Sequence, residues 1–252
     1  GGKFAIMITF PMAALLIKSW GWESTFYVPG VACLVWCVVW FLVVTSKPKD
    51  YRWISEAEHN FIKQSIGNTV ASKTTNRAPP LPLRSILTSL PFWAIFVAGL
   101  GGSVGFFTLL TYLPLYMKNM LHYDMKSSAA FSGLPYLGFI ILSLVIGYVG
   151  DLLRQKGYIR TGTLRKVSET IAHTGPALCM IGITFLTCDR TSTLILFFMA
   201  VTCQGGENSG WIVNSLDLSP NFAGTISGIA GAAATTGGWL APVLVAALIN
   251  NQ

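Results

Sequence analysis

Long apolar segments alternate with short polar ones along nearly the whole chain. A helix needs about 20 apolar residues to cross a hydrocarbon core roughly 30 Å thick, and seven segments approach or exceed that length. Because only helices satisfy their own backbone hydrogen bonds in lipid without closing into a barrel, we expect an all-α polytopic membrane protein. The predicted spans cover residues 4–17, 26–44, 93–117, 129–150, 171–188, 193–213 and 222–249.

Composition and charge placement favour a membrane protein over a soluble one. Hydrophobic residues make up 52% of the 252 residues and charged residues only 11%, whereas a soluble domain carries about 25%. Twelve Lys and Arg residues lie in the loops after the second and fourth predicted spans, against four after the first, third and fifth. Basic loops stay in the cytoplasm, so we expect a cytoplasmic N-terminus. The net charge of +7 then reflects orientation in a lipid bilayer, and no nucleic-acid partner is expected.

The segment between the second and third spans, residues 45–91, is long for a loop. A Ser55-x-x-Glu58 capping box predicts a short helix within it. An apolar stripe on this helix would lie against the membrane surface and consists of Phe61, Ile62 and Ile66. Residues 68–82 are rich in Ser, Thr, Asn and Pro, which predicts a flexible linker. A long cytoplasmic connection is typical of the join between two transporter halves, and an ordinary long loop is the alternative.

The sixth predicted span carries a regular set of polar side chains. At 100° per residue these side chains cover an arc of roughly 120° over about three turns of helix. The set consists of Gln204, Glu207, Asn208, Trp211, Asn214 and Ser215. Polar groups at membrane depth are costly unless they face a bundle interior or a watery cavity. The stripe therefore either lines a substrate path or forms hydrogen bonds between helices.

Two charged residues in or near the spans raise separate questions. Glu207 is the only acidic residue well inside any predicted span. A buried carboxyl group favours its protonated form, which suits proton coupling. It could instead pair with a Lys or Arg from helices outside this chain, or lie near an aqueous cavity. Lys3 either attracts an anion within the membrane or is an ordinary interfacial lysine.

Two further patterns indicate moving or closely packed parts. Asp151 and Arg154 follow Gly147 at the cytoplasmic end of the fourth span, where a carboxylate and an arginine can form a gate. The seventh span has small residues on one face, which predicts a groove for close helix approach. These small residues are Gly224, Gly228, Gly231, Thr235 and Gly238.

No motif of an enzyme or a metal site occurs in the sequence. We find no G-x-S-x-G, H-E-x-x-H or Walker A motif, and the five cysteines lack metal-ligand spacing. The sequence therefore predicts neither catalysis nor a bound metal or organic cofactor.

Several stretches resemble the anion–cation symporters, which include sialin, the sodium–phosphate transporters and the vesicular glutamate transporters. The stretches are residues 214–229 (NSLDLSPNFAGTISGI), 108–118 (TLLTYLPLYMK), 134–138 (LPYLG), 21–27 (GWESTFY) and 54–58 (ISEAE). The resemblance implies a partial major facilitator fold, in which the seven spans are helices five to eleven of twelve. Residues 1–44 would form the last two helices of the N-terminal half, and residues 45–91 would be the cytoplasmic loop that connects the halves. Residues 92–252 would form the first five helices of the C-terminal half. Helices one to four and helix twelve of the full-length protein would then be the helices with which this chain packs.

The resemblance also implies a function. Such proteins are secondary active transporters that carry small anions, inorganic phosphate or organic carboxylates, by alternating access coupled to Na⁺ or H⁺. The membrane would be the plasma membrane or a lysosomal or vesicular one. Gly147, Asp151 and Arg154 match the superfamily's gate motif, and Tyr112 and Tyr136 join the polar stripe as path candidates. The alternative is a truncated, non-transporting or regulatory membrane protein.

Three positions depart from the family pattern. Ser215 stands where family members usually have His, Gly231 where many have Asn, and Gly102 where vesicular glutamate transporters carry an Arg. The last departure disfavours a vesicular glutamate transporter, and the first two alter the expected ligand set.

Overall fold

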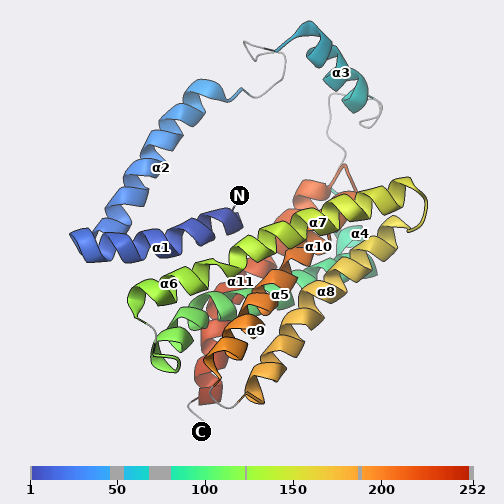
Figure 1. Cartoon of the computed structure of the whole chain (residues 1–252). Helices are drawn as coiled ribbons and strands as arrows, with labels where there is room; N and C mark the ends of the chain where they lie inside the picture. The colour runs from blue at the N-terminus through green and yellow to red at the C-terminus, as the bar shows by residue number, and fades with distance from the viewer. Residues whose placement is uncertain (1, 46–53, 68–80, 123, 187–188, 250–252) are drawn as a thin grey trace. The chain divides into compact units, whose positions relative to one another are not determined.

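The computed structural model describes residues 2–45, 54–67, 81–122, 124–186 and 189–249, and every regular element within these ranges is a helix. The helices are labelled in Figure 1. They are α1 (Gly2–Trp20), α2 (Ser24–Val43), α3 (Glu56–Gly67), α4 (Leu83–Leu87), α5 (Leu90–Asn119), α6 (Met125–Gly133), α7 (Pro135–Gln155), α8 (Thr161–Thr184), α9 (Arg190–Cys203), the 3₁₀ helix η2 (Gln204–Asn208), α10 (Trp211–Leu218) and α11 (Ala223–Ile249).

Five helical stretches of the described chain are long and apolar enough to cross a membrane. They are α1, α2, α5, the α6–α7 stretch from Ser128 to Gln155, and α11. The fifth and sixth predicted spans fall on α8 and on the segment from α9 to α10. Neither of these is among the five long apolar stretches. A total of seven spans and a cytoplasmic N-terminus therefore remain predictions.

The chain divides into two compact units, one of which is Leu16–Leu81. Its α2 exposes almost every apolar side chain, as Phe41 does at 86%, which suits contact with lipid or with other helices. The Glu58 N–H donates to the Ser55 Oγ at 3.2 Å, which is the expected capping bond, and α3 begins directly beside it. Ile66 has no described side chain, and most of the predicted linker lies outside the described residues.

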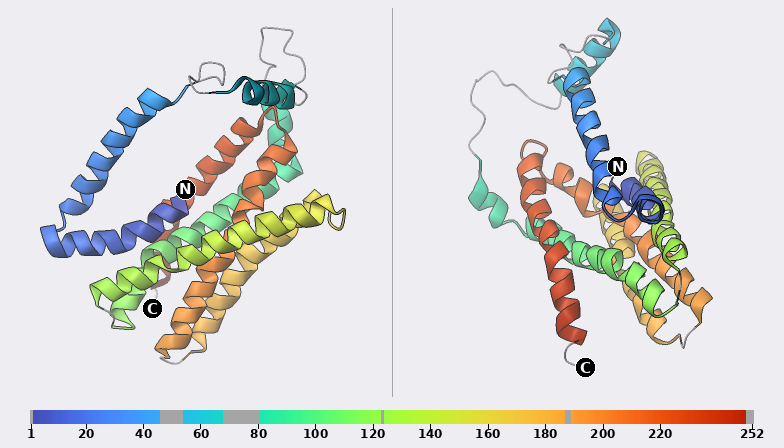
Figure 2. Two further views of the ribbon diagram at one scale, coloured as in Figure 1. Left: turned by 45° about the horizontal axis from the view of Figure 1, so that its top comes forward. Right: turned by 90° about the vertical axis from the view of Figure 1, so that its left-hand side faces the viewer.

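The second unit joins Gly1–Leu15 to Pro82–Gln252, whereas the sequence pattern grouped residues 1–44. Within it, α5 runs beside α11, and α9 lies against both α7 and α8 (Figure 2). One core surrounds Tyr136, Leu113 and Val201, and a second surrounds Phe92 and Ile226. Residues from the start of α1 pack against the first core, so this part of α1 is fixed within the unit.

The close approach of α5 and α11 uses different glycines from those predicted. Gly224, Gly228 and Gly231 have no neighbour within 4 Å of an added Cβ among the described residues, so the predicted groove stays a prediction over this part of α11. Gly237 instead lies against Ser103, where a Cβ would be 2.8 Å from the Ser103 Cβ. At Gly238, which was predicted, an added Cβ would lie 3.5 Å from the Phe107 ring.

The N-terminus of α9 is capped by a carboxylate. Asp189 accepts hydrogen bonds from the Ser192 hydroxyl and, at 3.2 Å, from the Thr191 N–H. These two bonds stabilise the ionised form and hold the pKa of Asp189 below its usual value. The helix therefore starts at Arg190 with part of its free N–H groups satisfied.

Three predicted spans have different boundaries or an interruption. The fourth is split into α6 and α7, because Pro135 begins α7 directly after Leu134. The fifth begins at Thr161, ten residues before the predicted start. The sixth is not a continuous α-helix, since η2 separates α9 from α10.

Candidate functional site

The interruption of the sixth span is built from glycines. Gly210 has a non-helical backbone (φ −88°, ψ −116°) and ends the turn before α10. Gly205 and Gly206 allow η2 to fit between α7 and α8. A Cβ at Gly205 would lie 2.5 Å from the Phe139 carbonyl oxygen, and one at Gly206 would overlap the Ser168 carbonyl oxygen. The prediction of one stripe on a regular α-helix is therefore wrong, because a 3₁₀ helix turns about 120° per residue rather than 100°.

Half of the predicted stripe faces a row of glycines on α5. Gly99, Gly102 and Gly105 of α5 face, in this order, Trp211, Glu207 and Gln204. An added Cβ at Gly102 would lie 2.8 Å from the Glu207 Oε1 atom. Gln204 is 3% exposed and Glu207 is 7% exposed, so these side chains lie in a helix interface. Among the described residues, Gln204 Oε1, Glu207 Oε1 and Trp211 Nε1 have no hydrogen-bond partner.

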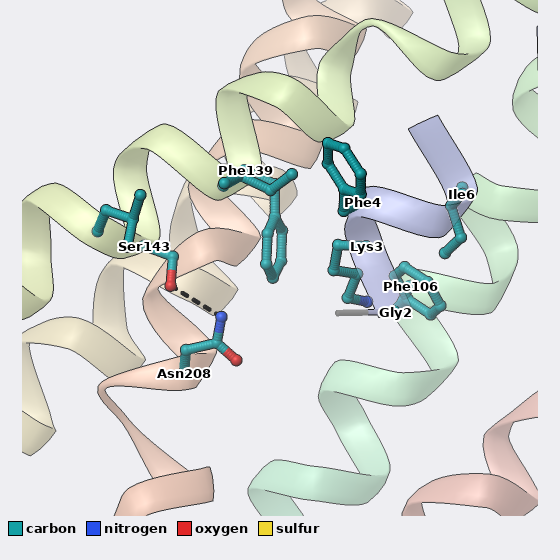
Figure 3. Close-up of a pocket in the computed structure, with 10 residues that line it drawn as sticks. Gly2, Lys3, Phe4, Ile6, Phe106, Phe139, Ser143 and Asn208 are labelled. Atoms are coloured by element: carbon teal, nitrogen blue, oxygen red, sulfur yellow. Dashed lines mark hydrogen bonds between the residues drawn. The ribbon is translucent and has the colours of Figure 1, made fainter. Parts of the chain in front are cut away.

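Asn208 points the other way, into a cavity of about 550 Å³ between α1, α5 and α7. Its side-chain N–H group donates to the Ser143 hydroxyl at 2.8 Å (Figure 3). Lys3 lines the same cavity, with its ammonium 2.9 Å from the centre of the Phe106 ring and 5.0 Å from that of Phe139. Lys3 is thus a cavity residue, and its depth in the membrane stays a prediction.

A second cavity of about 490 Å³ lies on the other side of the interruption, between α5, α8 and α10. It is lined by Trp211 and Asn214 and by three charged residues of α8, namely Arg165, Lys166 and Glu169. Arg165 donates to the Asp217 carboxylate at 2.8 Å and to the Ser209 carbonyl at 2.9 Å. The Ser209 carbonyl group at the interruption thus has a partner on α8.

Glu169 is a half-buried acid that the sequence pattern missed. One of its oxygens accepts the Trp211 N–H at 2.9 Å, at the start of α10. The other lies 3.2 Å from His173 Nδ1. Gly210 has no side chain, which leaves room for this carboxylate. The expected start of the fifth span at residue 171 excluded Glu169, although its four-residue spacing from His173 was visible in the sequence.

The remaining candidates are spread over the unit. Asp151 and Arg154 form an exposed pair at 3.7 Å near the end of α7, and a Cβ at Gly147 would lie 3.8 Å from the Ser209 hydroxyl. Tyr136 is 1% exposed and belongs to the first core. Tyr112 is half-buried on α5 and, like Tyr136, is not among the residues that line the two cavities. Within the described part of the chain, no three His, Cys, Asp or Glu side chains are grouped as metal ligands.

A sequence profile of the Major Facilitator Superfamily matches residues 1–242. The chain belongs to the Major Facilitator Superfamily. As a major facilitator chain with long apolar helices, it is a multi-pass membrane protein.

Three relatives of this major facilitator chain are informative. A Drosophila ananassae protein named "Putative inorganic phosphate cotransporter" is 37% identical over 255 residues, which cover 100% of the chain and 52% of that protein. Human sialin is 32% identical over 252 residues, 100% of the chain and 50% of sialin. A Caenorhabditis elegans protein named "Potential vesicular glutamate transporter vglu-3" is 34% identical over 241 residues, 94% of the chain and 44% of that protein. These similarities confirm the resemblance to the anion–cation symporters, and the chain spans about half the length of the relatives it matches.

Proposed function

We propose that the chain is part of a secondary active transporter for small anions, either inorganic phosphate or organic carboxylates. Transport proceeds by alternating access and is coupled to Na⁺ or H⁺. The proposal draws support from the superfamily and from relatives whose names refer to phosphate cotransport, sialin and glutamate transport. Helices one to four and helix twelve, outside this chain, would complete the two halves of the transporter, in the plasma membrane or a lysosomal or vesicular one.

The cavity at Lys3 carries the proposal. It presents one ammonium group, the amide of Asn208 and the hydroxyl of Ser143 among aromatic rings, which suits a small anion with several oxygens. A hydrogen bond to a charged group contributes about 1.5–3 kcal/mol, which corresponds to roughly 10- to 100-fold in affinity. The ring faces of Phe106 and Phe139 hold the ammonium by cation–π attraction until an anion takes their place.

The interrupted helix supplies a movable element beside this cavity. Discontinuous helices form the substrate and ion sites of many secondary transporters, and rocking about them exchanges access between the two sides. In this chain the interruption lies between the two cavities, so movement of α10 against α9 would alter both. Gly147, Asp151 and Arg154 would form the cytoplasmic gate. Of these three residues, Gly147 lies close to Ser209, which follows η2.

Uptake by proteoliposomes that contain the full-length chain tests this function. Radiolabelled phosphate and organic anions are offered with imposed Na⁺ or H⁺ gradients, and wild type is compared with Lys3→Gln. We expect gradient-driven uptake, and a rise of about tenfold or more in KM for Lys3→Gln. Lys18→Gln, on an exposed position of the same helix, is the matched control and should leave KM unchanged. Absence of uptake of every anion would overturn the proposal, and an unchanged KM in Lys3→Gln would remove Lys3 from the anion site.

A further inference from the structure

We propose that Lys3 fills a cation site of its cavity with its own ammonium group, and that it thereby restricts the transporter to anions that carry no ammonium group. This role of Lys3 rests on the proposed function, in which the cavity binds the transported anion. It separates phosphate and simple carboxylates, which the cavity would accept, from amino acids, which it would reject.

The Lys3 ammonium lies beside two aromatic rings. Its nitrogen is 2.9 Å from the centre of the Phe106 ring and 5.0 Å from that of Phe139, and Figure 3 shows the lysine side chain between these two residues. The face of an aromatic ring attracts an ammonium group, and proteins use such faces to recognise quaternary ammonium ligands. The Phe106 and Phe139 rings therefore form a cation site, and its occupant belongs to the protein itself.

No carboxylate of the described residues forms an ion pair with this ammonium. The ion pairs in the described ranges use the acids Asp151, Glu169 and Asp217, and none of them includes Lys3. Lys3 is also the one charged residue among the described residues that line the cavity. The ring faces, rather than a counter-ion, thus hold the ammonium in place.

The cavity would suit a cation even without Lys3. Asn208 donates its side-chain N–H to the Ser143 hydroxyl at 2.8 Å, and its amide oxygen remains as an acceptor. Amide oxygens and ring faces both attract positive charge. A shortened side chain at position 3 would therefore leave a site for a free organic ammonium ion, whereas the native lysine keeps this site filled.

An α-ammonium group has no favourable position in the filled cavity. Next to Lys3 it would be one of two positive charges roughly 5 Å apart, which repel each other. Elsewhere it would lie against apolar side chains such as Phe4, Ile140 and Leu144, and would lose its water without gaining a partner. Phosphate and simple carboxylates avoid this cost and still gain a charge-assisted hydrogen bond from Lys3.

Binding of radiolabelled tetramethylammonium to the purified full-length protein tests the cation site. Wild type should show no saturable binding, because Lys3 fills the site. Lys3→Ala should gain saturable binding, and Lys3→Ser is a second variant that shortens the side chain in a similar way. Misfolding does not produce such a gain, and the thermal unfolding midpoint shows whether each variant is folded.

Two neighbouring rings of α5 provide a matched comparison. Phe106→Leu and Phe107→Leu are each combined with Lys3→Ala. Phe106 lies under the ammonium, whereas the Phe107 ring faces Gly238 of α11. We expect Phe106→Leu to weaken tetramethylammonium binding by about 5- to 30-fold, and Phe107→Leu to change it by less than about twofold.

Uptake by proteoliposomes of the full-length protein tests the selectivity. Glutarate and glutamate are compared beside phosphate, because these two dicarboxylates differ only by the α-ammonium group. Wild type should prefer glutarate over glutamate by at least about tenfold in kcat/KM. Lys3→Ala should reduce this preference by at least about tenfold, because the α-ammonium group can then enter the cation site.

Absence of tetramethylammonium binding in folded Lys3→Ala and Lys3→Ser would overturn the cation site. Unfolding of both variants would overturn it as well, since Lys3 would then be a structural residue, and so would equal effects of the Phe106 and Phe107 substitutions. Wild-type uptake of glutamate as efficient as that of glutarate would overturn the selectivity and keep the proposed function. No uptake of any anion would overturn the proposed function, whereas the binding measurement would still decide the cation site.

Discussion

Replacing Gly205 with alanine would force a methyl group into the contact between η2 and α7. An ideal Cβ at this position lies 2.5 Å from the Phe139 carbonyl oxygen and 3.1 Å from the Ser143 backbone nitrogen. Both neighbours are main-chain atoms of a helix, so a change of side-chain rotamer cannot relieve the overlap. The two segments must move apart, and the hydrogen bond between Asn208 and Ser143 is strained by the same movement.

Two opposing effects set the size of the change. Alanine restricts the unfolded chain more than glycine does, which stabilises the folded state by about 0.5–1 kcal/mol. The Cβ would sit about 1 Å inside an ordinary contact distance of roughly 3.5 Å, and overpacking of this kind costs about 1–3 kcal/mol. We therefore expect a net loss of about 1–2 kcal/mol in the free energy of unfolding. The unfolding midpoint should fall by roughly 3–6 °C.

Thermal unfolding of the purified full-length chain in detergent, followed by tryptophan fluorescence, measures this loss. Gly101→Ala is the control, because its added Cβ meets nothing within 4 Å and only the effect on the unfolded chain remains. Its midpoint should be equal to or above that of wild type. A Gly205→Ala midpoint as high as that of Gly101→Ala would refute the close approach of η2 and α7.

Three further predictions concern charged residues. Arg165, whose side chain is 13% exposed, and Asp217 lie 2.8 Å apart, so a double-mutant cycle with alanine should give a coupling of about 1–2 kcal/mol; a value near zero would contradict the pairing. Asp189 has a lowered pKa, so its cap stabilises α9 above the unfolded pKa and is lost only as pH falls through the folded value. The difference in unfolding midpoint between wild type and Asp189→Ala should thus stay constant from pH 8 to about pH 5 and shrink below about pH 4; shrinkage already near pH 6 would contradict this assignment. Asp151 and Arg154 are exposed and 3.7 Å apart, so Arg154→Ala should change stability by less than about 0.5 kcal/mol while it slows transport if the pair is a gate. A large loss of stability would indicate a structural role instead.

Apolar runs predicted the uninterrupted helices well. The predicted spans 26–44 and 93–117 correspond to α2 at Ser24–Val43 and α5 at Leu90–Asn119. A membrane-spanning helix needs such an apolar run whatever helices surround it, so the local sequence is sufficient to predict it. The start of α8 was missed because residues 161–170 contain charges that hydropathy assigns to a loop. In the fold two of those charges have partners, Arg165 in Asp217 and Glu169 in His173.

The interruptions depend on packing and were harder to predict. Gly205, Gly206 and Pro135 are visible in the sequence, but glycine and proline are frequent in membrane helices and do not by themselves mark a break. A side chain at Gly205 would overlap the backbone of α7, and one at Gly206 would overlap that of α8. Both contacts join segments that are far apart in the sequence. For the same reason the polar spacing identified the candidate residues of the sixth span but not their directions. Asn208 and Glu207 are adjacent in sequence, yet one lines a cavity and the other faces α5.

The shortness of α10 has a mechanical consequence. It contains eight residues, and a helix of fewer than about 12 residues is marginal on its own. Hydrogen bonds to neighbouring helices therefore help to keep it ordered. Glu169 accepts its first N–H, Arg165 donates to its Asp217, and its Ser215 hydroxyl lies 2.7 Å from the Ser227 hydroxyl. Two of these ties lead to α8 and one to α11. Because α10 is bound on one side to α8 and on the other to α11, we expect a rearrangement that separates these two helices to break at least one of these sets of bonds. The order of α10 therefore depends on the spacing of its neighbours more than on its own length.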